Sequence, residues 1–253
     1  MIELKNISKS FNKQLILKNL NLEIKKGESL VIIGRSGCGK SVSLKHMIGL
    51  VRPDSGTVLV EGMDISTLKS NELDQMRLKF GMLFQGAALF DSLTVLENVG
   101  FQLLEYTDMS YVQVKRRVSE CLEMVGLHGI ENMKPAALSG GMKKRVGLAR
   151  AISMSPKIIL FDEPTTGVDP ITGDVINKLI RYLHNTLKTT SITVTHDMKS
   201  AYQIADRIAM LYDKQIIEVG TPDEIKNSKN QIVQQFINGD AEGPITAGIG
   251  SRF

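Results

Sequence analysis

A glycine-rich segment near residue 37 has the residue types and spacing of a phosphate-binding loop. It matches G-x-x-x-x-G-K-[ST] at every fixed position, reading Gly34-Arg35-Ser36-Gly37-Cys38-Gly39-Lys40-Ser41. Glycines let successive backbone N–H groups point at phosphate oxygens. Lys40 can reach the β- and γ-phosphates of a nucleotide, and Ser41 can offer its hydroxyl to Mg²⁺. We expect residues 34–42, Val42 included, to bind a nucleotide, although the loop alone fits GTPases, kinases and motors equally well.

Cys38, inside this loop, allows two interpretations. Nearby amides and a helix N-terminus favour a thiolate, so the thiol could be redox-sensitive. A small residue that fits a tight loop is the simpler interpretation, and we favour it.

Two acids follow an apolar run further along the chain, in Lys157-Ile158-Ile159-Leu160-Phe161-Asp162-Glu163-Pro164. If this run is a strand beside the strand that enters the phosphate loop, Asp162 can hold the Mg²⁺ that Ser41 also contacts. Glu163 can then polarise an attacking water as a general base. An acidic turn after a buried strand is the alternative, but the complete phosphate loop upstream favours the catalytic interpretation.

A second anion-binding segment, Ser139-Gly140-Gly141, precedes a basic segment of helical periodicity. A hydroxyl, exposed N–H groups and a helix dipole would together attract phosphate. The chain thus has two phosphate-binding loops but one hydrolytic set. This is odd for a monomer, so we expect a homodimer in which the second loop caps the nucleotide of the other copy.

The elements that position these residues alternate between strands and helices, which predicts an α/β fold with a parallel sheet. Two N-terminal runs predict a small antiparallel sheet, and the stretch 87–151 reads as an inserted helical subdomain. We expect a domain over residues 1–238 and a Gly-rich tail over 239–253 that is disordered unless a partner orders it. The expected strands are 1–7, 15–24, 29–33, 57–60, 80–84, 157–161, 191–195, 208–211 and 215–219, and the expected helices are 40–50, 71–79, 95–105, 111–125, 142–153, 172–185 and 198–205.

Composition narrows the class of protein. The chain has 253 residues with 42% hydrophobic composition, which suits one large domain or two closely packed subdomains. Its net charge of +4 is too weak a bias to indicate nucleic-acid binding. Two cysteines give no disulfide framework or metal spacing, which favours a cytosolic chain. Because no apolar run approaches the ~18 residues needed to span a bilayer, any membrane crossing falls to another chain.

With these motifs, residues 1–235 resemble the ABC transporter ATPases, which implies a RecA-like P-loop NTPase core, an N-terminal antiparallel β subdomain and an inserted α-helical subdomain. The resemblance implies ATP and Mg²⁺ as ligands. It matches Phe11 to the aromatic that stacks on adenine and Gln85 to the glutamine that approaches Mg²⁺ and water. It also matches Asp169 to the loop that crosses to the partner and His196 to the histidine that contacts the γ-phosphate. A core role for Phe11 stays open.

Two residues depart from the family pattern. Met142 stands where the family most often has Gln, which puts a polar contact near the capping loop in doubt. Val168 replaces the commoner Leu with little expected consequence. Beside Gln85, an apolar cluster could receive a membrane permease or simply pack in the core; its members are Ala87, Ala88, Leu89, Phe90 and Leu93.

Within the family, three stretches look like the ATPases of MCE-associated, Mla-type phospholipid transporters. They are LSGGMKKRVGLAR at 138–150, FDEPTTGVDPI at 161–171 and QFINGDAEGPI at 235–245. The resemblance implies a permease dimer, a periplasmic MCE lipid-binding protein and a STAS-domain protein as partners, with the chain on the cytoplasmic side of the inner membrane. The alternatives are a small-solute importer such as an amino-acid importer, a soluble ABC ATPase of translation or DNA repair, and a P-loop kinase or GTPase.

Overall fold

The computed structural model describes residues 1–247 and contains two sheets. In the six-stranded sheet all neighbours are parallel except β10 and β9. Its strands, in spatial order, are β10 (Gln215–Gly220), β9 (Arg207–Tyr212), β3 (Ser29–Ile33), β8 (Thr190–Thr195), β7 (Ile158–Asp162) and β6 (Phe80–Leu83). The antiparallel four-stranded sheet has the order β2 (Gln14–Ile24), β1 (Ile2–Phe11), β4 (Ser55–Val60) and β5 (Met63–Asp64).

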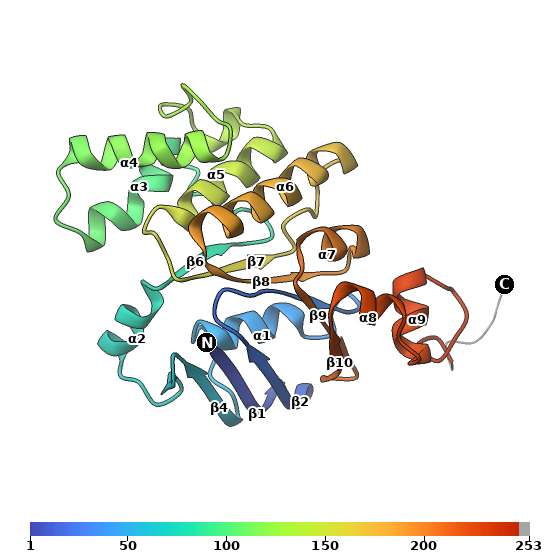
Figure 1. Ribbon diagram of the computed structural model, residues 1–253. Coiled ribbons are helices and arrows are strands. Elements are labelled where there is room, and N and C mark those ends of the chain that lie inside the picture. The colour runs from blue at the N-terminus through green and yellow to red at the C-terminus, as the bar shows by residue number, and fades with distance from the viewer. Residues whose placement is uncertain (248–253) are drawn as a thin grey trace.

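Helices cover the larger sheet on both faces (Figure 1). The helices of residues 1–247 are α1 (Lys40–Met47), α2 (Ser70–Arg77), α3 (Val95–Tyr106), α4 (Tyr111–Met124), α5 (Gly140–Ile152), α6 (Pro170–Leu187), α7 (Met198–Ile204), α8 (Pro222–Lys226) and α9 (Gln231–Asn238), with a 3₁₀ turn at Pro135–Ala137. The expected α/β P-loop fold, with an antiparallel β layer and inserted helices, is confirmed. Helices α3, α4 and α5 lie within the range 87–151, and their separateness as a subdomain stays a prediction.

Strand β3 shows why the central strands of the larger sheet have continuous apolar sequences. All five of its residues are buried, and its four apolar residues alternate between two cores. Val31 and Ile33 face the core shared with the helices α3–α7, whereas Leu30 and Ile32 face the core shared with α1 and the four-stranded sheet. A strand covered on both faces carries apolar side chains on both. This buried strand delivers the phosphate loop to the carboxyl edge of the sheet.

One expectation about the sheet is wrong. Strand β7, which ends at Asp162, does not lie beside β3, because β8 is hydrogen-bonded between them. Asp162 still reaches the phosphate loop because α1, which begins at Lys40 within that loop, contacts both β7 and β8. The start of α1 therefore places Ser41 beside Asp162, although β3 and β7 are not neighbours.

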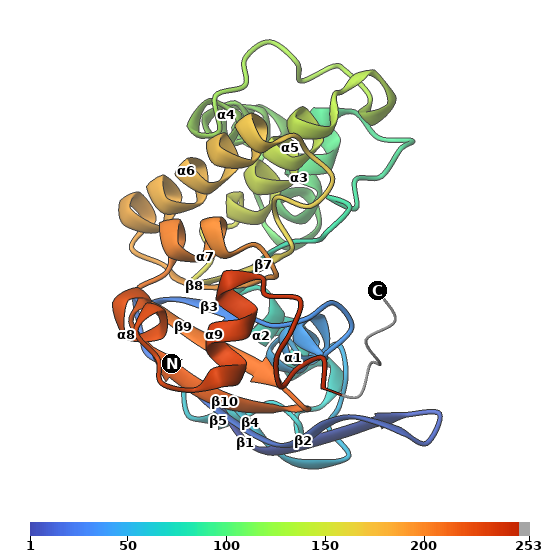
Figure 2. The ribbon, with the colours of Figure 1, turned by 90° about the vertical axis from the view of Figure 1, so that its right-hand side faces the viewer.

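The end of the chain is more ordered than expected over residues 239–247, which fold back on α9 (Figure 2). The buried Gln235 side chain accepts a hydrogen bond from Ile245 N at 2.7 Å and donates one to Asp240 O at 3.1 Å. The remainder of the expected tail, 248–253, lies outside the described residues. Among residues 1–247, no helix combines the length and the apolar character needed to cross a membrane.

Candidate nucleotide-binding site

A cavity of about 340 Å³ gathers residues that follow the ends of β3, β6, β7 and β8. Ligand sites of open α/β sheets lie at this carboxyl edge. Eleven residues line the cavity, ten of them predicted from the sequence: Phe11, Ser36, Gly37, Gly39, Lys40, Ser41, Val42, Gln85, Glu163 and His196; the eleventh is Ile16. Residues far apart in the sequence thus meet around one space large enough for a nucleotide's phosphates.

The phosphate loop needs glycine at two positions for different reasons. Gly39 has φ of 109°, a conformation that L side chains rarely adopt, and a Cβ there would lie 2.8 Å from Leu17 Cδ2. At Gly34, a Cβ would lie only 2.4 Å from the backbone oxygen of Leu211. The fold therefore enforces a loop of bare backbone, whose N–H groups remain available to an anion.

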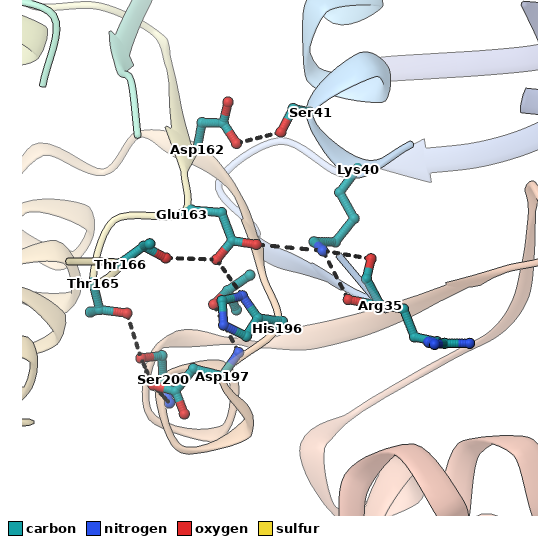
Figure 3. A network of polar contacts seen from close by, with 12 residues as sticks. Arg35, Lys40, Ser41, Asp162, Glu163, Thr165, Thr166, His196, Asp197 and Ser200 are labelled. Carbon is teal, nitrogen blue, oxygen red and sulfur yellow. Dashed lines mark hydrogen bonds and ion pairs between the residues drawn. The ribbon is translucent and has the colours of Figure 1, made fainter. Parts of the chain in front are cut away.

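Lys40 lies at the bottom of this loop and is 5% exposed. Its ammonium donates to the carbonyls of Gly34 at 2.8 Å and Arg35 at 3.1 Å, and lies 3.4 Å from Glu163 Oε1 (Figure 3). Backbone carbonyls fix the direction of the ammonium without neutralising its charge. A buried, positively charged donor in this position is suited to an anionic ligand.

Glu163 is held by side chains from three parts of the chain (Figure 3). Its Oε2 accepts hydrogen bonds from His196 Nδ1 at 2.9 Å and from Thr166 Oγ1 at 3.2 Å. Its backbone has φ of 46°, which costs a non-glycine residue about 1 kcal/mol or more and is found mostly at functional sites. The carboxylate is only 10% exposed. It is therefore a pre-positioned acceptor beside the phosphate-loop lysine.

Ser41 and Asp162 meet, as the sequence predicts, although their strands are not neighbours. Ser41 Oγ donates to Asp162 Oδ1 at 2.7 Å. A hydroxyl and a carboxylate supply the hard oxygen ligands that Mg²⁺ prefers, and this ion usually completes its shell with waters and substrate phosphates. Among residues 1–247 there is no cluster of three His, Cys, Asp or Glu side chains that could hold a metal alone. The pair suits an ion that arrives with its nucleotide.

Cys38 and Gln85, two further residues of the predicted site, differ in burial. Burial raises the pKa of the Cys38 thiol, and this outweighs the opposing charge of Lys40. The thiol form is therefore favoured, in agreement with a small residue that fits the loop. Gln85 is exposed and lines the cavity, while its backbone carbonyl accepts a hydrogen bond from the Lys144 ammonium.

The second phosphate-binding segment does not line this cavity. Ser139 is the N-cap of α5, where its Oγ accepts from Met142 N at 3.3 Å and keeps its own proton free to donate. Ser139 and Gly140 are exposed. The side chain of Met142 is half-buried and packs against the apolar core, so its lack of a polar group costs no contact inside this chain.

Asp169 also lies apart from the nucleotide cavity, at the N-cap of α6. Its Oδ1 accepts from the backbone N–H groups of Ile171 and Thr172, each at 3.0 Å. The Thr172 hydroxyl, which donates to Oδ2 at 2.6 Å, contributes most to lowering the pKa of the carboxyl group. Asp169 lines a second cavity of about 410 Å³ that His196 also lines. His196 thus stands between the two cavities.

Sequence reasoning missed three residues near the site. Thr166 binds the Glu163 carboxylate, Ile16 lines the cavity near Phe11, and Lys144 contacts the backbone of Gln85 and Glu163. No local pattern indicates that Lys144 is buried, because a lysine in a basic helical segment normally faces solvent. The local sequence around Glu163 could have indicated Thr166, since a hydroxyl three residues later can turn back on a carboxylate.

Comparison with known proteins agrees with this geometry. The family model for the ABC transporter matches residues 17–166. The intermembrane phospholipid transport system ATP-binding protein MlaF of Haemophilus influenzae is 41% identical over 97% of this chain and 93% of its own length. The methionine import ATP-binding protein MetN of Carboxydothermus hydrogenoformans is 44% identical over 94% of this chain and 72% of its own length.

The fold also matches a solved ATP-binding cassette. That structure is a dimer in a post-hydrolysis state with ADP and Pi, and it aligns with a TM-score of 0.81 at 37% identity. The alignment covers 88% of this chain and 99% of the cassette. Phosphate loop, paired acids, overall fold and sequence similarity thus agree, and the chain belongs to the ABC transporter family as an ATP-binding, ATP-hydrolysing subunit.

Proposed function

We propose that the chain works as a head-to-tail homodimer with two ATP molecules at its interface. Each nucleotide lies between residues 34–41 of one copy and residues 139–141 of the other. One observation carries this proposal: the cavity collects a full hydrolytic set, whereas the second phosphate-binding segment is exposed outside it. The dimeric state of the related cassette bound to ADP and Pi supports the same arrangement.

The side chains of the cavity divide the work of binding. Phe11 is 42% exposed on the rim, where its ring offers a face to adenine. The Lys9 ammonium lies 5.4 Å from the centroid of that ring and makes it a platform fixed by a cation–π contact. Lys40 and the loop N–H groups bind the phosphates, so base and triphosphate extend from the rim to the bottom of the cavity.

Glu163 acts as the general base in hydrolysis. Its carboxylate accepts a proton from the water that attacks the γ-phosphorus, and the bond to the bridging oxygen of ADP breaks. His196 donates to the same carboxylate at 2.9 Å and orients it, and from this position it can also contact the γ-phosphate. Because Lys40 lies 3.4 Å from Glu163 Oε1, an arriving γ-phosphate competes with Glu163 for the ammonium and frees the base.

Ser41 and Asp162 are the residues that would hold Mg²⁺, with Gln85 approaching from the rim. The ion, when bound with ATP, neutralises charge on the β- and γ-phosphates. The Ser41 hydroxyl and the Asp162 carboxylate, which lie 2.7 Å apart, would supply oxygen ligands to such an ion.

Phospholipid is the cargo that the relatives favour. The MlaF relative spans nearly the same length as this chain and is named for intermembrane phospholipid transport. The MetN relative keeps methionine import as the second candidate, since it is 44% identical, but this chain covers only 72% of its length. We propose a permease dimer as the membrane partner, with an MCE protein and a STAS-domain protein as accessory partners, at the cytoplasmic side of the inner membrane.

The helical region offers a surface on which a permease can dock. The buried Asn98 side chain binds both Phe90 N and Phe90 O, at 2.8 and 3.1 Å, and so holds the loop that follows Gln85. Phe90 is 47% exposed, and its ring packs beside that of Phe101, with 5.3 Å between the two ring centroids. Of the apolar cluster beside Gln85, Ala87 is core, whereas Ala88 and Phe90 are exposed. The two interpretations thus apply to different members of the cluster.

The test is phospholipid transfer by the assembled transporter. The complex that contains this chain is placed in vesicles with a fluorescent phospholipid, and transfer to acceptor vesicles is followed with ATP. We expect transfer that requires ATP and is lost in Glu163→Gln, with Glu23→Gln, an exposed carboxylate on β2, as the matched control. Uptake of radiolabelled methionine without lipid transfer would overturn the cargo and favour the importer.

A further inference from the structure

Lys144 is a buried cation whose hydrogen-bond partners are backbone carbonyls. It lies in the second turn of α5 and is 5% exposed. Its ammonium donates to the carbonyl of Gln85 and, at 3.3 Å, to the carbonyl of Glu163. No carboxylate in residues 1–247 lies within 4.0 Å of it. Burying a lysine this way is costly: burial lowers the pKa of its ammonium, and this outweighs the opposing negative charges of Asp162 and Glu163. A lysine at this position is therefore poorly explained by stability alone.

The same helix binds the segment after Gln85 a second time. The Arg150 guanidinium donates to Ala87 O at 2.5 Å and to Ala88 O at 2.7 Å. Both alanines are in left-handed conformations, with φ of 61° and 47°, which such residues adopt only when their surroundings enforce it. Two cations of α5 thus define the path of the backbone over residues 85–88.

Close packing makes this attachment stiff. Gly147 of α5 faces strand β6, and a Cβ at this position would lie 2.6 Å from Leu83 Cδ1. Helix α5 also contacts α3, α4 and α6 (Figure 1). Packed elements pass on a shift rather than absorb it. A displacement of α5 is therefore transmitted to the segment that carries Gln85.

The N-terminus of α5 carries the capping segment, Ser139–Gly141, which in the proposed dimer contacts the nucleotide of the other copy. We propose that Lys144 is a positioning residue that links this segment to the chain's own hydrolytic site. Through the carbonyls of Gln85 and Glu163, it aligns these two residues when α5 engages the partner's ATP. The two sites of the dimer then hydrolyse cooperatively. This inference rests on the proposed dimer.

The test compares Lys144→Met, which removes the charge and the donors, with Lys144→Arg, which keeps them. Lys115, an exposed lysine of α4, provides the matched control Lys115→Met. Steady-state ATPase is measured against ATP concentration in the assembled transporter, and ATP binding is measured by equilibrium titration. We expect Lys144→Met to lower kcat at least about tenfold, to bring the Hill coefficient to 1 and to leave the ATP Kd within about twofold, with partial rescue in Lys144→Arg.

Two results would overturn the proposal. One is an unchanged kcat and Hill coefficient in Lys144→Met. The other is a fall in kcat that is matched by a fall in thermal stability and is not rescued by Lys144→Arg. If Lys144→Met does not fold, Lys144→Leu, which also removes the charge and the donors, is measured instead, with the same expected loss of cooperativity. Failure of the dimer itself is seen separately, as absence of ATP-dependent dimerisation in Glu163→Gln carrying wild-type Lys144.

Discussion

The nucleotide cavity and the capping segment of α5 both have the residue types of phosphate sites, but they differ in burial and in hydrogen bonding. In the cavity, Lys40 and Glu163 are buried and held by hydrogen bonds from distant parts of the chain. In the capping segment, Ser139 and Gly140 are exposed, and within residues 1–247 the Ser139 side chain is hydrogen-bonded only to its own helix. The hydrolytic residues gather within one copy, whereas the capping segment does not line their cavity. The difference supports the proposal that each nucleotide is bound between two copies.

The largest expected effect concerns the cavity. Glu163→Gln removes the proton acceptor while keeping a side chain of the same size beside Lys40 and His196. We expect turnover to fall by about 10²–10⁴-fold, with ATP binding retained and an ATP-dependent dimer that accumulates. ATPase assays and size-exclusion chromatography check both parts. Turnover near that of the wild type would remove Glu163 from the role of base.

A second variant separates folding from capping. Gly140 is the first residue of α5, and a Cβ there would meet no atom closer than 3.9 Å. Gly140→Asp should therefore fold, and a carboxylate in the first turn stabilises a helix by about 0.3–1 kcal/mol. Its charge would repel the partner's γ-phosphate, so we expect ATPase to fall at least about tenfold, which is 1.4 kcal/mol.

The matched control for this variant is Gln231→Asp, which adds a carboxylate to the first turn of α9. It should leave ATPase unchanged. ATP binding to the monomer, measured by titration, should be the same in both variants. A Gly140→Asp protein that binds ATP less well as a monomer would show that the segment acts within its own chain and would contradict its role as a cap for the partner's nucleotide.

A third variant tests Asp162, the proposed metal ligand beside Ser41 of the phosphate loop. Asp162→Asn keeps a partner for Ser41 but loses a charge, so we expect the Mg²⁺ concentration for half-maximal ATPase to rise about 10–100-fold. Saturating Mg²⁺ should restore much of the activity, and EDTA should abolish it in both proteins. An unchanged Mg²⁺ requirement would contradict the assignment of Asp162.

The smallest effect is expected at Met142. Its side chain packs on the core, so Met142→Gln exchanges an apolar contact for an amide and should lower the free energy of unfolding by about 1 kcal/mol. ATPase should stay within about threefold of the wild type. A large rise in activity would show instead that the capping segment lacks a polar contact that Gln supplies.

Much of the site could be predicted because its chemistry is concentrated in short motifs. The loop around Lys40 and the pair Asp162–Glu163 are contiguous in sequence, and each follows a buried apolar strand that fixes its place at the sheet edge. The expected helices and strands lie within a few residues of those observed, since their apolar periodicity reflects faces that are buried. The start of α5 differs, because Gly140 and Gly141 belong to its first turn.

What could not be predicted depends on long-range packing. The insertion of β8 between β3 and β7 follows from strand pairing, which no local pattern encodes. Lys144 is buried only because α5 meets the segment after β6. Helix α8 is different: Thr221 and Glu224 form a capping box around Pro222, a signal that was available but was overlooked.

The claim that each ATP site is built from two copies is tested most directly by mixing two inactive variants. In Lys40→Ala each copy has a defective phosphate loop, and in Gly140→Asp each has a defective capping segment. A mixed dimer has one site with both defects and one intact site. With random pairing, half the dimers are mixed and each has one intact site. We therefore predict ATPase above that of either component alone and at most about a quarter of the wild-type value, because the intact site lacks an active neighbour. A mixture no more active than its two components would contradict the shared site.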